Sequence, residues 1–92
     1  FALHYQRMNI RWDPLKSKSL KRTRGVSFED ILRATFVTIE QHPKRPHQKL
    51  MLFELDNYIW TVPYVQAGDD IFLKTLFPSR MYTKKWMRGE LG

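Results

Sequence analysis

Two apolar segments separated by a two-residue turn constrain the fold more than any other feature of the sequence. Residues 49–55, KLMLFEL, and residues 58–65, YIWTVPYV, flank the pair Asp56-Asn57. Asn tolerates the positive φ that tight hairpin turns require, so this pattern predicts a β-hairpin. A second turn at residues 68–70 leads into the apolar residues 71–77. We therefore predict a three-stranded antiparallel meander.

The third strand of this meander differs from the other two in its pattern. Both alternating sets of residues 71–77 are largely apolar, with Lys74 as the exception, and this is typical of a strand covered on both faces. The middle strand contains Pro63, which has no N–H to donate to a ladder. We expect a bulge or a locally unpaired position there.

A corner follows the third strand at Pro78-Ser79-Arg80. Proline ends the strand, and the serine hydroxyl can accept hydrogen bonds from the first N–H groups of a helix that begins near Arg80. The sequence therefore predicts a guanidinium held where a rigid sheet meets a helix.

The N-terminal part of the chain predicts a short strand over residues 8–12 and then a helix. Asp13 and Pro14 are typical of a helix start, and Gly25 supplies the stop. This helix is basic nearly all round, so we expect it to lie across the sheet edge rather than in the core.

A second helix is expected to start at Ser27, with acidic residues in its first turn where the helix dipole favours them. The β-branched residues 35–40 predict a strand, and the proline-rich residues 42–47 predict a basic loop with two histidines. Together these elements predict an α+β fold: a three- to four-stranded antiparallel sheet, two N-terminal helices and a short C-terminal helix.

Length and composition predict a single small domain without cysteine chemistry or a membrane-spanning helix. Ninety-two residues, 42% of them apolar, suffice for one domain with its own core. We expect that domain over residues 8–92, with residues 1–7 an upstream extension or a tag remnant. Cysteine is absent, which removes disulfides and thiolate chemistry. Apolar runs are far shorter than the ~20 residues of a membrane helix, so we expect a soluble protein that does not act at a membrane.

The charge of the chain favours a polyanionic partner. The net charge is +7 and the isoelectric point is about 10.0. Residues 1–24 carry seven basic residues and one acidic residue, and residues 66–92 carry five and three. A small fold can bring these two basic ends onto one face, although basic helices are also often simply solvated.

The residues that could carry chemistry are cationic and aromatic. No histidine and carboxylate have helical metal-ligand spacing and no glycine-rich phosphate loop is present, so we predict neither a metal nor a cofactor. The predicted catalytic residues are Arg80, Lys74, Lys49, Tyr82, His47 and His42. The predicted RNA-binding residues are Lys16, Lys18, Lys21, Arg22, Lys44, Arg45, Lys84 and Lys85.

These residue types suit RNA cleavage without a metal ion. The 2′-hydroxyl of RNA can attack the adjacent phosphate, so the protein needs only an acid, a base and cations to stabilise the added charge. The same residues equally fit a non-catalytic nucleic-acid-binding module, or a basic surface that a protein partner covers. Loop histidines are most often plain surface residues, and Lys74 can reach water past its apolar neighbours.

Two motifs and their order resemble the BrnT family of bacterial type II toxin–antitoxin systems, within the RelE-like endoribonucleases. The first is Trp12-Asp13-Pro14 with Lys16, followed by Gly25-Val26-Ser27-Phe28-Glu29-Asp30. The second is a strand that ends in Ser79-Arg80 ahead of a basic helix. The resemblance extends over residues 8–86.

This resemblance implies a function and partners. A BrnT-like protein would be a toxin that cleaves messenger RNA without a metal ion in the bacterial cytoplasm. Its partner would be a ribbon-helix-helix antitoxin, and operator DNA would be bound only through that antitoxin. The family's terminal-strand arginine corresponds to Arg80, whereas Lys74 is a near neighbour of the other basic position. The chain departs from the family at Arg24, where many members have a histidine, and in the final helix, where many have a glutamate.

Overall fold

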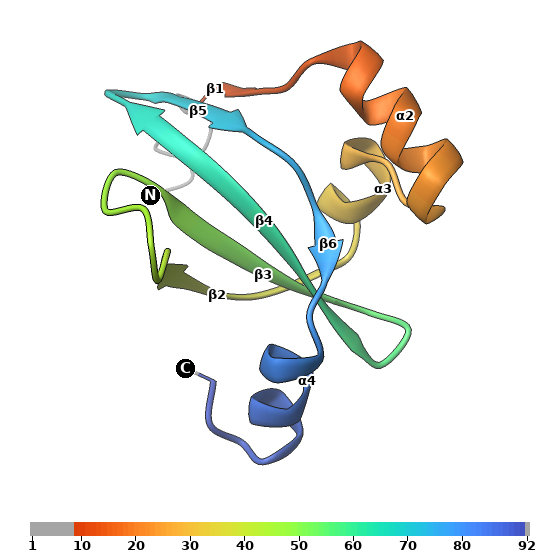
Figure 1. Cartoon of the computed structure of the whole chain (residues 1–92), viewed down its shortest axis with the longest axis vertical. Helices are drawn as coiled ribbons and strands as arrows, with labels where there is room; N and C mark the ends of the chain where they lie inside the picture. Colours follow the sequence, from red (N-terminus) through yellow and green to blue (C-terminus); the bar gives the residue numbers. More distant parts are fainter. Residues whose placement is uncertain (1–8, 92) are drawn as a thin grey trace.

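The computed structural model describes residues 9–91, and the expected extension over residues 1–7 lies outside them (Figure 1). The described residues fold into a sheet with three helices, and the α+β class is confirmed. In order, the elements are β1 (Asn9–Arg11), α2 (Pro14–Arg24), α3 (Phe28–Leu32), β2 (Thr35–Gln41), β3 (Lys49–Leu55), β4 (Tyr58–Ala67), β5 (Asp70–Leu73), β6 (Phe77–Pro78) and α4 (Arg80–Met87).

The sheet is larger than the sequence predicts. Its strands follow the order β1-β5-β4-β3-β2, and β6 also pairs with β4. All pairs are antiparallel except β1 with β5, which is parallel. β1 is anchored at Asn9, whose backbone N–H donates to Asp69 O at 2.8 Å and whose amide Nδ2 donates to Asp70 Oδ1 at 3.1 Å. The expectation of three or four antiparallel strands is therefore corrected to six strands in a mixed sheet within residues 9–91.

The predicted hairpin is confirmed. β3 and β4 pair in continuous register, and the turn residues Asp56 and Asn57 have φ of 54° and 64°. Pro63 keeps its place opposite Leu50, so no bulge forms there. A bulge occurs instead in β2, where the register with β3 shifts between Phe36 and Thr38.

Pro63 affects the pairing of β4 with the strand on its other side, away from β3. Its carbonyl accepts a hydrogen bond from the Lys74 N–H at 2.8 Å, and in an antiparallel strand the missing N–H points to that same side. No second ladder bond is available at this point, and the neighbouring strand is interrupted over residues 74–76. The expected continuous strand over residues 71–77 is wrong: β5 ends at Leu73 and β6 begins at Phe77.

Both N-terminal helices have the predicted caps. The Asp13 side chain accepts from Leu15 N, and Gly25 ends α2 with φ of 80°. Ser27 and Asp30 form a reciprocal capping box on α3. The two helices are joined by buried Ser17, which donates to Glu29 Oε1 at 2.5 Å and accepts from Phe28 N at 3.0 Å.

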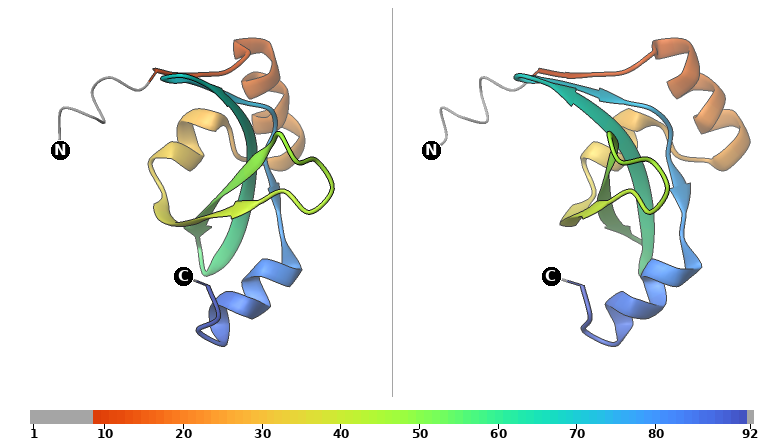
Figure 2. Two further views of the ribbon diagram at one scale, coloured as in Figure 1. Left: turned by 90° about the vertical axis from the view of Figure 1, so that its left-hand side faces the viewer. Right: turned by 60° about the vertical axis from the view of Figure 1, so that its left-hand side comes forward.

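The two faces of the sheet are covered unequally. One face, the helix-covered face, buries the side chains of Met51, Phe53 and Val62 together with residues of α2 and α3. On the other face, Leu50, Leu52 and Ile59 pack against Tyr82 and Trp86 of α4. Figures 1 and 2 show α4 at one end of this second face and the loop before β3 on the side opposite α3.

Candidate nucleic-acid interface

Strands β5 and β6 expose aromatic side chains on the face that α4 covers only in part. Phe72 pairs with Val65 and Phe77 pairs with Thr61. Because these β4 partners are four residues apart, both phenylalanines project from the same side of the sheet. Phe72 is 39% exposed and Phe77 is 37% exposed. We call this surface, formed by the exposed Phe72, Lys74 and Phe77 over the buried Thr61 and Pro63 of β4, the open face, and the prediction that the strand is covered on both sides is wrong.

Lys74 belongs to the open face. Ile71 and Leu73 are buried on the helix-covered face, so the alternation of β5 directs Phe72 to the other side, and Lys74, just after β5, reaches the Phe72 ring there. The Lys74 Nζ lies 5.5 Å from the centroid of the Phe72 ring, within range of a cation–π contact. Its side chain is exposed, and a positive charge therefore lies beside an aromatic ring.

The predicted corner at Arg80 is built as the sequence indicates. Ser79 caps α4 by accepting a hydrogen bond from the Tyr82 N–H at 3.1 Å, and the Ser79 N–H donates to Ile59 O at 2.9 Å. Thr83 Oγ1 donates to Ser79 O at 2.7 Å and accepts from the buried Ile59 N–H at 2.8 Å. The exposed Arg80 therefore extends from a junction tied to the central strand, and it makes no ion pair with any residue in 9–91.

Tyr82 is buried beneath α4 on the same side of the sheet. Desolvation by burial raises the pKa of its hydroxyl, and the negative charge of Glu40 raises it further. Lys85 Nζ lies 5.9 Å from the ring centroid. A phenol with a raised pKa stays protonated near neutral pH, so Tyr82 is suited to donating a proton or hydrogen bond rather than to accepting a proton.

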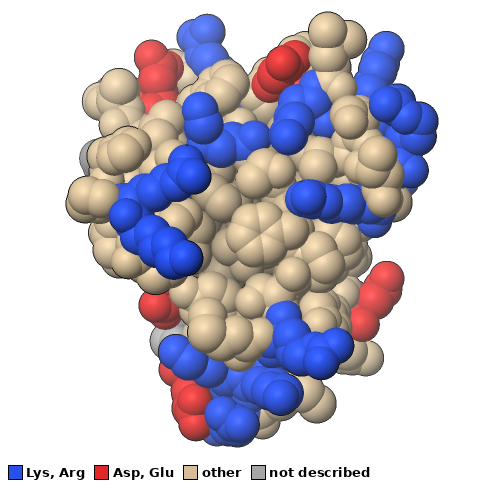
Figure 3. Space-filling model, viewed as in Figure 1, with Lys and Arg blue, Asp and Glu red and all other residues tan. Residues whose placement is uncertain are grey.

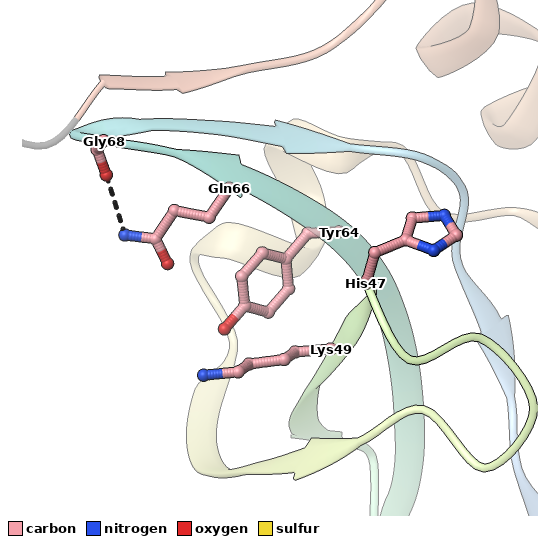
Figure 4. A pocket seen from close by; sticks show the side chains of 5 residues that line it. All are labelled: His47, Lys49, Tyr64, Gln66 and Gly68. Atoms are coloured by element: carbon pink, nitrogen blue, oxygen red, sulfur yellow. Dashed lines mark hydrogen bonds between the residues drawn. The ribbon is translucent and has the colours of Figure 1, made fainter.

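The two loop histidines differ in what they can offer. His42 is half-buried, and its Nδ1 accepts hydrogen bonds from the N–H groups of Lys44 and Arg45, each at 3.1 Å. This nitrogen is therefore used in shaping the loop. His47 is exposed, and its ring points away from the side chains of Lys49 and Tyr64 (Figure 4).

Lys49 lies on the opposite side of the sheet from Lys74 and Tyr82. It pairs with Tyr64, which belongs to the core of the helix-covered face. An open pocket of about 360 Å³ is lined by Lys49, Tyr64, Gln66, Gly68 and His47. Figure 4 shows the side chains of Lys49 and Tyr64 extending in the same direction from their strands. Burial raises the pKa of the Tyr64 hydroxyl. Lys74 and Tyr82 thus share one side of the sheet, and Lys49 lies on the other.

The predicted RNA-binding residues are exposed and come from three elements. Figure 3 shows basic side chains around an uncharged area over the strands, on the face that carries β6. Lys21 of α2 is engaged with Asp30 at 2.8 Å, so its role is at least partly structural. The remaining members are Lys16, Lys18 and Arg22 of α2, Lys44 and Arg45 of the loop, and Lys84 and Lys85 of α4.

Three features of this surface are missing from the sequence-based prediction. Strict alternation over residues 71–77 places Phe72 and Phe77 on opposite faces, and only the break between β5 and β6 brings both onto the open face, so the sequence pattern gives no signal for the pair. Arg24, whose Nη1 donates to Leu76 O and so ties α2 to the interrupted strand, had no sequence signal. The proximity of Glu40 to Tyr82 likewise depends on how distant segments pack.

Within residues 9–91 no group of three histidine, cysteine or acidic side chains is placed to hold a metal ion. No helix in the same residues is long and apolar enough to cross a membrane.

The fold is defined by a mixed sheet with two N-terminal helices over one face and a C-terminal helix at one end of the other. The crystal structure of the Brucella abortus ribonuclease toxin, BrnT, is similar, with a TM-score of 0.52 and 19% sequence identity. The match covers 78% of this chain and 96% of that chain. No family model matches the sequence, and no curated protein matches it by sequence. The chain therefore has a BrnT-like fold, as the resemblance in its sequence motifs predicts.

Proposed function

We propose that this protein is an endoribonuclease toxin that cleaves messenger RNA. The observation that carries the proposal is the placement of Arg80, an exposed guanidinium on a junction that is hydrogen-bonded to the central strand and directly follows β6, the strand that carries Phe77 of the open face. The BrnT-like fold supports it, because the similar structure is a ribonuclease toxin.

The proposed reaction uses the nucleophile of the RNA itself. The 2′-oxygen forms a bond to the adjacent phosphorus, the bond from phosphorus to the 5′-oxygen breaks, and a 2′,3′-cyclic phosphate and a 5′-hydroxyl result. Arg80, with Lys74, stabilises the charge on the phosphorane, since a guanidinium matches two phosphate oxygens. Tyr82 supplies the proton to the leaving 5′-oxygen, because even a phenol with a raised pKa is a stronger acid than the alcohol that forms. Of the two histidines, exposed His47 is the better candidate to accept the 2′-hydroxyl proton.

Cleavage of purified single-stranded RNA in the presence of EDTA tests this proposal. We expect products with 2′,3′-cyclic phosphate ends, and we expect Arg80→Ala to lower the rate by roughly 10²-fold or more. Arg33→Ala is the matched control, because Arg33 is exposed and pairs with Asp30 away from the open face. RNA that stays intact after long incubation, with and without ribosomes, would contradict the proposal.

A non-catalytic role is the competing function. The His42 Nδ1 is already occupied and Tyr82 is a poor base, so residues 9–91 present few groups for the first proton transfer. Salt-dependent RNA binding that persists in Arg80→Ala, without cleavage by the wild-type protein, would identify a binding module.

We also propose a small ribbon-helix-helix antitoxin as partner, with operator DNA bound only by the complex, and action in the bacterial cytoplasm. Co-expression with a ribbon-helix-helix protein encoded beside this gene should yield a complex that survives purification and suppresses cleavage. Cleavage at an unchanged rate in the presence of that partner would argue against it.

A further inference from the structure

We infer that Phe72 and Phe77 form a platform on which two unpaired bases of single-stranded RNA stack, so that the site discriminates against duplex RNA. This inference rests on the proposed function and specifies its substrate. Phenylalanine rings that project from one face of a sheet, with cations beside them, match the requirements of a single strand, whose bases are accessible and whose backbone is anionic.

The rings are held on backbone that does not need to order on binding. Phe72 lies in β5, which pairs with β4 on one side and with β1 on the other, and Phe77 pairs with Thr61 of β4. More than a third of each side chain stays exposed although the neighbouring Leu73 and Leu76 are buried. Rigid aromatic side chains contribute to binding with little loss of conformational entropy.

The spacing of the rings suits two separate bases. Their β4 partners, Val65 and Thr61, are four residues apart, which corresponds to about 13 Å along a strand. Bases stacked on each other in a helix lie much closer than this, so each ring would receive a base from an extended strand. Lys74 follows Phe72 on the same face, where its ammonium can meet a linking phosphate.

The charges around the platform select the class of occupant. Basic side chains border the uncharged area in Figure 3. The acidic residue of β5, Asp70, is already engaged by Asn9 and lies 3.9 Å from Arg11 Nε. An apolar surface edged by cations favours a polyanion with flat apolar parts over an apolar protein surface.

Binding of a short 2′-O-methyl RNA, which cannot undergo cleavage by its own 2′-hydroxyl, tests the platform independently of catalysis. Fluorescence anisotropy should show that Phe72→Ala and Phe77→Ala each weaken binding of the single strand by at least about fivefold. Phe72→Trp and Phe77→Trp should restore it. The duplex of the same sequence should bind more weakly than the single strand, and the alanine variants should reduce this preference.

Two further variants separate stacking from folding. Phe72→Leu and Phe77→Leu keep an apolar side chain but remove the aromatic face, so they should bind as weakly as the alanine variants. Phe36→Ala is the matched control, because Phe36 is 51% exposed and packs against Phe53 on the helix-covered face. It should bind as the wild-type protein does.

Salt dependence distinguishes stacking from phosphate contact. The phenylalanine variants should leave the slope of log Kobs against log salt unchanged, whereas Lys74→Ala should reduce its magnitude by about 0.7. Leucine variants with wild-type affinity would overturn the inference even if the protein cleaves RNA. Conversely, ring-dependent binding by a protein that never cleaves would uphold the platform and refute the proposed function. If the phenylalanine variants keep wild-type RNA affinity but no longer self-associate as the wild-type protein does, the rings would instead belong to a protein interface.

Discussion

At the scale of single residues, Thr83 determines how firmly Arg80 is held. Its hydroxyl satisfies the buried Ile59 N–H at 2.8 Å and donates to Ser79 O at 2.7 Å. Thr83→Val keeps the shape of the side chain but leaves that N–H without a partner, so we expect a loss of about 1–3 kcal/mol in the free energy of unfolding. Urea titration measures this loss.

Thr23→Val is the control for that measurement. Thr23 Oγ1 donates to Ser19 O at 2.8 Å on the exposed side of α2, and its loss strands no buried donor. This variant should unfold almost as the wild-type protein does. Equal destabilisation by both substitutions would show that the Thr83 hydroxyl has no special role at the junction.

At the scale of elements, the link between α2 and α3 makes stability depend on pH. Hydrogen bonding from Lys21 is the largest cause that holds the Asp30 pKa well below its ordinary value, and the Ser27 N–H adds to it. A carboxylate whose pKa is lowered by folding stabilises the fold above its unfolded pKa of about 3.9, and this contribution is lost as pH falls below that value.

Asp30→Asn should therefore destabilise the protein at neutral pH, and the difference from wild type should shrink as the pH is lowered through about 4. Unfolding titrations of both proteins across this range test the sign. Asp69→Asn, in the exposed turn before β5, should differ little from wild type throughout. A difference for Asp30→Asn that stays constant with pH would contradict the assigned cause.

The elements also show which parts of the fold the sequence can predict. Both helix caps, the hairpin turn and the Ser79 start of α4 were predictable because each depends on residues a few positions apart. The break between β5 and β6 was not predictable, because the missing N–H of Pro63 removes a hydrogen bond to whichever strand lies beside it, and the sequence does not say which strand that is. The parallel pairing of β1 with β5 likewise depends on contacts about sixty residues apart along the chain.

The candidate site follows the same division. Arg80 could be singled out because Pro78 and Ser79 define its corner locally. The separation of Lys49 from Lys74 could not, since a residue's face depends on strand register, and a shift of one residue reverses it. Phe72 and Phe77 do not stand out in the sequence, because a strand whose two alternating sets are both apolar indicates cover on both sides. Their exposure is a property of the assembled sheet.

At the scale of the whole molecule, the effect on RNA binding of where the basic residues lie can be separated from the effect of the net charge. Lys44 and Arg45 lie in the loop on the side of the sheet opposite α3, whereas Lys16 and Lys18 lie on α2 (Figure 2). Replacing either pair by glutamine lowers the formal net charge from +7 to +5, so long-range attraction of RNA should fall equally. The two variants differ only in where the charge is removed.

We expect the loop pair to affect equilibrium binding more than the helix pair. Each phosphate that the protein no longer neutralises reduces the slope of log Kobs against log salt by about 0.7, so a loop that touches the RNA should lower the slope by up to twice that amount. The α2 variant should mainly slow association at low salt, because α2 belongs to the helix-covered face and can steer the strand without holding it. Stopped-flow and anisotropy measurements across a salt series give both quantities. Identical slopes for the two variants would mean that RNA responds to the net charge of the molecule, and that the open face is not where the strand lies.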